Sequence, residues 1–140
     1  MVQIENLPAE LRELGLFCCW RYENRRGADK PTKSPYNPRT GGGAMSNNPA
    51  TFAPLETAVA ASGAYDGLGV GVFNGLGAID IDHCINESGE ISEMAVDIMS
   101  TMQAYTEYSP SRRGLRILFK ASGFSYDKAR YYTMNAGRGL

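Results

Sequence analysis

The sequence has no long hydrophobic run, few cysteines and only one histidine. No apolar stretch approaches the roughly 20 residues that a membrane-spanning helix needs. The N-terminus also lacks the basic segment followed by an apolar one that is typical of a signal peptide. The three cysteines, Cys18, Cys19 and Cys84, have neither the number nor the spacing of a disulfide framework or a zinc site. We therefore expect a cytoplasmic protein that does not bind membranes and that buries its cysteines as small apolar side chains.

A strong charge of either sign is also absent, because the formal net charge is -1 over 140 residues. Nothing in the overall composition therefore indicates a nucleic-acid-binding protein. Any such contact must come from local basic clusters, which occur at 21–33, 112–120 and 128–138. A solvated surface is the alternative for each cluster. The chain has 140 residues, of which 43% are hydrophobic. This length and composition are sufficient for one domain with its own core.

The most informative stretch runs from Gly75 to Cys84 and contains alternating isoleucines and aspartates. In a strand, Ile79 and Ile81 would enter the core while Asp80 and Asp82 would share the other face. Two carboxylates that close repel each other, and a divalent cation such as Mg²⁺ or Mn²⁺ would relieve the repulsion. An edge strand with a solvated face gives the same pattern.

The spacing of hydrophobic residues and the positions of glycine and proline predict short helices that alternate with strands. We expect helices at 8–14, 52–62 and 91–103 and strands at 16–22, 68–73, 78–82, 105–108, 115–120 and 129–135. The stretch 23–48 is rich in glycine, proline and asparagine and is expected to be a loop. The glycine-rich segment 74–77 predicts a hairpin between its flanking strands. The methionine stripe of the third helix is interpreted as core packing.

Several short motifs follow one another along the chain. They are Lys33-Ser34-Pro35-Tyr36-Asn37-Pro38, Ile79-Asp80-Ile81-Asp82-His83-Cys84, Tyr105-Thr106-Glu107-Tyr108-Ser109-Pro110-Ser111, Gly114-Leu115-Arg116-Ile117 and Arg130-Tyr131-Tyr132-Thr133. In this order they resemble the primase-polymerase domain of plasmid and phage replication proteins, a group of the archaeo-eukaryotic primase superfamily. The resemblance implies an α+β fold over residues 1–140. In that fold an RRM-like antiparallel sheet carries the site, and an N-terminal αβ unit packs beside it.

The resemblance also implies an activity, which is primer synthesis or DNA polymerisation on a single-stranded DNA template in a bacterial or archaeal cell. It implies NTP or dNTP as substrate, two Mg²⁺ or Mn²⁺ ions, and a replicative helicase as a possible partner. Asp80 and Asp82 correspond to metal ligands, and Asp127 is the nearest carboxylate to the place of a third. The remaining assignments are phosphate binding by Arg116, Ser111, Arg113 and Lys33, and nucleic-acid binding by Arg112, Lys30, Arg130 and Tyr132.

The sequence departs from the family pattern at three points. Arg116 stands at the usual histidine position, Arg112 stands where glycine usually follows Ser-Pro-Ser, and no acid occurs near Phe124. Arginine binds phosphate but neither accepts a proton nor ligates a metal. Two hypotheses therefore remain, an active enzyme and an impaired relative that binds nucleotide, nucleic acid or a protein. A two-metal phosphodiesterase is a third, although the usual additional ligands are missing. The natural chain either ends at Leu140 or continues beyond it.

Overall fold

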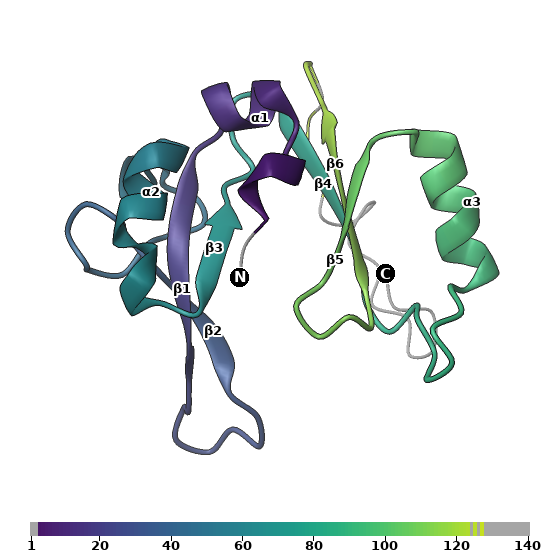
Figure 1. Cartoon of the computed structure of the whole chain (residues 1–140), viewed down its shortest axis with the longest axis horizontal. Coiled ribbons are helices and arrows are strands. Elements are labelled where there is room, and N and C mark those ends of the chain that lie inside the picture. The colour runs from purple at the N-terminus through teal and green to yellow at the C-terminus, as the bar shows by residue number, and fades with distance from the viewer. Residues whose placement is uncertain (1–2, 124, 126, 128–140) are drawn as a thin grey trace. The chain divides into compact units, whose positions relative to one another are not determined.

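The computed structural model describes residues 3–123, 125 and 127 and divides the chain into two compact units, Met1–Phe73 and Asn74–Leu140 (Figure 1). Each unit contains a three-stranded antiparallel sheet together with helices. The predicted α+β class is confirmed at this level, whereas the RRM-like arrangement and the single domain over 1–140 stay predictions. None of the helices in the described part of the chain is long and apolar enough to cross a membrane.

The first unit combines a sheet of order β2-β1-β3 with short helices. Its elements are the 3-10 helices η1 (Ile4–Asn6), η2 (Pro49–Thr51) and η3 (Ser62–Ala64), the α-helices α1 (Ala9–Leu14) and α2 (Leu55–Ala61), and the strands β1 (Phe17–Glu23), β2 (Thr32–Tyr36) and β3 (Gly67–Val70). The predicted helix at 8–14 and the predicted strand at 16–22 are confirmed.

The core of this unit lies between β1 and α2. Phe17 is buried there with Leu55 and Ala58 of α2. Cys19 is two residues further along β1 and is fully buried, with its thiol 3.6 Å from the carbonyl oxygen of Ala58. Because alternate residues of a strand share a face, this face of β1 is covered by α2. Trp20 and Tyr22 therefore belong to the opposite face.

One prediction for the first unit was wrong, and a second was confirmed except for where the element begins. The expected loop at 23–48 contains β2. This strand lies at the edge of the sheet, where the proline nitrogen of Pro35 does not have to donate a hydrogen bond to a neighbouring strand. The expected helix at 52–62 is confirmed as α2, but it begins only at Leu55, after Pro54. Ala53 instead forms a bridge with Phe17 through two backbone hydrogen bonds of 2.7 and 2.8 Å.

The second unit has a sheet of order β4-β6-β5 with one helix packed on it. Its elements are the strands β4 (Leu76–Ile81), β5 (Tyr105–Tyr108) and β6 (Leu115–Lys120) and the helix α3 (Glu93–Met102). Ile81 and Ile117 are completely buried, and the methionines of α3 pack against their cluster. The interpretation of the methionine stripe as core packing is therefore confirmed. The predicted strand at 129–135 lies outside the described residues.

The predicted hairpin through 74–77 was also wrong. Asn74 and Gly75 do form a turn with positive φ angles of 55° and 77°. The strands on either side nevertheless pair elsewhere, β3 with β1 and β4 with β6. Each strand pairs in the sheet where its own apolar side chains are buried, and this long-range burial overrides the local turn signal.

Candidate functional site

Three charged side chains form a row across the sheet of the second unit. Asp80 on β4 is paired with Arg116 on β6, and Arg116 is paired in turn with Glu107 on β5. Residues that are directly opposite in an antiparallel sheet share a face. This face is opposite to the one that packs Ile79 and Ile81 against the core, as predicted for that alternation. We call Asp80, Arg116 and Glu107 the charged row.

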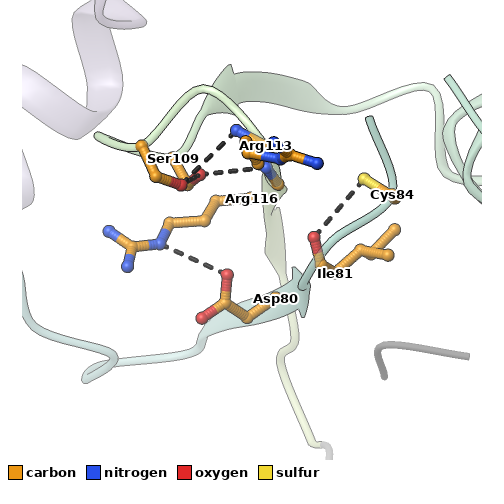
Figure 2. A network of polar contacts seen from close by, with 8 residues as sticks. Asp80, Ile81, Cys84, Ser109, Arg113 and Arg116 are labelled. Atoms are coloured by element: carbon orange, nitrogen blue, oxygen red, sulfur yellow. Dashed lines mark hydrogen bonds and ion pairs between the residues drawn. The ribbon is translucent and has the colours of Figure 1, made fainter. Parts of the chain in front are cut away.

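The closest contact in the charged row joins Arg116 and Asp80. Arg116 Nε lies 3.4 Å from Asp80 Oδ1, and the side chains are 39% and 54% exposed (Figure 2). An ion pair this exposed contributes at most about 1 kcal/mol to stability because water and salt screen it. The contact uses Nε, so the two terminal nitrogens of the guanidinium can donate to an anion without breaking it.

Glu107 was not singled out in the sequence, although its strand is part of one of the quoted motifs. The hydroxyl of Tyr105 donates to Glu107 Oε2 over 3.2 Å. Burial and then the neighbouring Glu107 carboxylate raise the pKa of Tyr105 to about 12. Tyr105 therefore remains protonated at any physiological pH and holds the carboxylate of Glu107 on the same face as Arg116.

Asp82 lies one residue beyond the end of β4, in a turn, and its side chain is exposed. Two contacts hold this turn in place. The Cys84 thiol lies 3.4 Å from the Ile81 carbonyl oxygen (Figure 2). The Ile85 N–H donates to the Arg113 carbonyl oxygen over 3.1 Å. His83, the next residue of this turn, is exposed with a left-handed φ of 53°. A turn at the strand end exposes the side chain that alternation alone would place on the core face.

The loop between β5 and β6 closes through Ser109 and Gly114. The buried Ser109 Oγ accepts from the Gly114 N–H over 3.1 Å, and the Ser109 N–H donates to the Gly114 carbonyl oxygen over 2.9 Å. Ser111 Oγ is 3.0 Å from Ser109 Oγ, so this hydroxyl also has a role within the loop. A Cβ at Gly114 would lie 2.7 Å from the Ile81 carbonyl oxygen and 3.5 Å from Asp82 Cα. The missing side chain therefore lets the loop approach Asp82 closely.

Two arginines extend from this loop. Arg112 adopts a left-handed φ of 59°, a backbone conformation that glycine adopts more readily than other residues. Its guanidinium lies 5.9 Å from the centre of the exposed Tyr108 ring. Arg113 is exposed next to it. The structure thus brings Arg112, Arg113 and Ser111 together on one loop that contacts the turn of Asp82.

The other predicted site residues lie elsewhere. Lys33 is on β2 of the first unit and Lys30 is in the segment before it, both exposed. Arg130, Tyr132 and the position near Phe124 are outside the described residues. Asp127 is described and exposed, yet within residues 3–123, 125 and 127 no three His, Cys, Asp or Glu side chains gather to hold a metal. Asp80 and Asp82 still supply exposed oxygen ligands of the hard type that suits Mg²⁺ or Mn²⁺.

Comparison with known proteins gives one informative relationship. The chain is 32% identical over 120 residues to a protein of Nitratiruptor phage NrS-1 that is named DNA Primase-polymerase. The aligned region covers 82% of this chain but only 16% of that protein. No family model matches the chain.

Proposed function

This chain belongs to the primase-polymerase domains, and we propose that it transfers nucleotides onto a growing strand directed by single-stranded DNA. The reaction would be primer synthesis, strand extension or both, during replication of a phage, a plasmid or an integrated element. NTP or dNTP would be the substrate. The observation that carries the proposal is Arg116 held beside Asp80, next to a loop with two more arginines. We further propose that the β4-β6-β5 sheet corresponds to an RRM-like sheet.

In this proposal Arg116 binds the triphosphate of the incoming nucleotide. Guanidinium groups bind phosphate oxygens through paired hydrogen bonds and stay charged at any working pH. Arg112 and Arg113 would neutralise the remaining charge on the triphosphate or on the template backbone. Ser111 would orient the loop, and its hydroxyl could donate to phosphate after turning away from Ser109.

The acidic residues would hold the metal ions. Asp80 and Asp82 would ligate Mg²⁺ or Mn²⁺, which when bound would activate the primer 3'-hydroxyl and stabilise the leaving pyrophosphate. Asp80 can supply this ligand because Arg116 contacts only one of its two oxygens. Glu107, oriented by Tyr105, would balance the charge of Arg116 when Asp80 binds a metal ion.

A second candidate function is a catalytically impaired relative that binds nucleotide, nucleic acid or a replication protein. The observation that favours it is that no third carboxylate, histidine or cysteine joins Asp80 and Asp82 in a metal-binding cluster within the described part of the chain. Under this alternative Arg116 and its neighbours would still bind phosphate, since that binding needs no proton transfer.

Primer synthesis and extension on single-stranded DNA, with Mg²⁺ and with Mn²⁺, test the proposal. We expect product from the wild type and none from the Asp80→Asn/Asp82→Asn variant. Asp97→Asn is the matched control, because Asp97 is an exposed carboxylate on α3, away from the strands that carry the charged row. Absence of product from folded wild-type protein would overturn the enzyme proposal and favour the binding alternative.

A further inference from the structure

The first unit carries aromatic and basic side chains on the face of β1 that is opposite α2. The rings of Trp20 and Tyr22 meet edge to face, with centroids 5.1 Å apart and planes at 79°. Lys33 is paired with Tyr22 across β1 and β2, and its Nζ lies 5.2 Å from the centroid of Trp20. We call Trp20, Tyr22 and Lys33 the aromatic patch.

Trp20 gives the aromatic patch a rigid base. Its indole N–H donates to the Leu68 carbonyl oxygen over 3.0 Å. Its ring lies directly on Gly67, where a Cβ would come within 2.6 Å of the ring atoms. Tyr22 packs against this fixed ring but is itself 50% exposed. Its backbone N–H is held by the Asp66 carboxylate at 2.8 Å. Tyr22 therefore presents a large aromatic surface to solvent at little entropic cost.

Basic residues flank the aromatic patch along the chain, and among them Arg21 lies on the opposite face of β1, with its guanidinium 4.5 Å from the centre of the Tyr65 ring. The segment 21–33 has five basic and two acidic residues in a chain whose net charge is -1. Arg25, Arg26 and Lys30 are exposed in the connection between β1 and β2. Glu23 lies on the opposite face, where its carboxylate accepts a hydrogen bond from the Tyr36 hydroxyl. Hydrogen bonds from Ser34 and Tyr36 hold the pKa of Glu23 below its ordinary value. That negative charge is thus kept away from the aromatic patch.

We propose that the aromatic patch is a binding site for single-stranded DNA, in which a base stacks on Tyr22 while Lys33 and the neighbouring basic residues bind phosphates. An aromatic surface beside a basic groove is the combination that binds single strands without sequence preference. A duplex keeps its bases stacked on one another and cannot offer one to Tyr22. The choice of DNA as the nucleic acid rests on the proposed function, whereas the surface itself is in the other unit from Asp80 and Asp82.

Trp20 is the single tryptophan of the chain, so its intrinsic fluorescence reports on the aromatic patch. Oligo(dT) of about 12 nucleotides would be titrated into the protein without nucleotide or metal, and Trp20 fluorescence and DNA anisotropy would be followed together. We expect saturable quenching. Tyr22→Ala should weaken binding on the order of tenfold, while Tyr22→Phe keeps it, since one stacked base is lost only in the first variant. Lys33→Gln should reduce the slope of log K against log salt by about 0.7.

A matched ligand separates stacking from charge. An abasic strand of the same length should bind wild-type protein about as weakly as oligo(dT) binds Tyr22→Ala. Equal affinity of the wild type for abasic and normal strands, or of Tyr22→Ala and wild type for oligo(dT), would overturn the proposal. Thermal unfolding would establish that each variant is folded. This binding needs no metal and can be measured apart from primer synthesis. If the wild type bound oligo(dT) in a Tyr22-dependent way but made no primer, the result would count against the proposed function alone.

Discussion

Arg116 on β6 and Asp80 on β4 face each other as directly paired residues of adjacent strands, with Nε and Oδ1 3.4 Å apart. Each of these side chains is substantially exposed, so the pair contributes little to stability. The strand register instead places the Arg116 guanidinium beside the Asp80 carboxylate. Both groups lie near the end of β4, where the chain enters the turn of Asp82. A nucleotide triphosphate with its metal ions needs this neighbourhood of opposite charges.

Replacing Arg116 should therefore weaken the binding of a nucleotide triphosphate while leaving the stability of the fold almost unchanged. For Arg116→Gln we expect a loss of no more than about 1 kcal/mol in the free energy of unfolding, measured by urea denaturation. Nucleotide triphosphate affinity, measured by calorimetry, should fall roughly tenfold, since a charged hydrogen bond to phosphate is lost. Lys120→Gln on the same strand is the control, because it removes the same charge at the far end of β6. Equal affinities of the two variants would show that Arg116 does not bind the triphosphate.

Arg112 has a backbone conformation that favours glycine, and two substitutions can isolate this effect. Arg112→Gly and Arg112→Ala both remove the contact with Tyr108, but only alanine keeps a Cβ at a φ of 59°. We expect the glycine variant to be more stable than the alanine variant by about 1 kcal/mol in urea denaturation. At Arg113, where φ is not positive, the order should reverse because glycine gains more chain entropy on unfolding. The same order at both positions would contradict the left-handed assignment.

Gly114 should be needed for space rather than for a special φ. Gly114→Ala would place a Cβ 2.7 Å from the backbone oxygen of Ile81, which cannot move away as a flexible side chain would. We expect a loss of about 1–3 kcal/mol in stability, as is typical of overpacking. Gly63→Ala is the control, because no atom lies within 4 Å of its Cβ position. A Gly114→Ala variant as stable as Gly63→Ala would show that the loop and the Asp82 turn are not held together.

Much of the local structure could be predicted because the signals are local. The stripe of α3 follows the period of a helix, and the alternation around Ile79 and Ile81 follows the period of a strand. β2 was missed because its proline and its polar neighbours are typical of loops, whereas an edge strand accepts them. The hairpin at 74–77 was predicted from a genuine turn, but strand pairing is decided by which core each strand enters.

For the candidate site, the sequence indicated residue types but not neighbours. Asp80 and Arg116 were each selected, yet their contact depends on the register of β4 with β6, which no local pattern reveals. Glu107 was missed for the same reason, since it joins the charged row only through the pairing of β5 with β6.

The buried thiol of Cys18 gives the protein a predictable response to high pH. Burial, with the neighbouring Cys19 as a second cause, raises the pKa of Cys18 to about 11, above the value of about 8.5 for a free thiol. Because the folded-state pKa is the higher one, this contribution to stability is complete below about pH 8.5 and is lost as the pH rises toward 11. Urea denaturation would give the free energy of unfolding at pH 8 and at pH 10.5. Between these two values the wild type should lose more stability than Cys18→Ala, which has no thiol to ionise at this position.

Alkylation provides an independent measurement of the same effect. At pH 8 Cys18 should react with iodoacetamide far more slowly in the folded protein than in urea, because the reactive thiolate is scarce and the side chain is only 6% exposed. Mass spectrometry of peptides would locate the modified residue, and the urea sample is the control for complete reaction. If folded and unfolded protein were alkylated at Cys18 at the same rate, the thiol would be accessible and its raised pKa would be excluded.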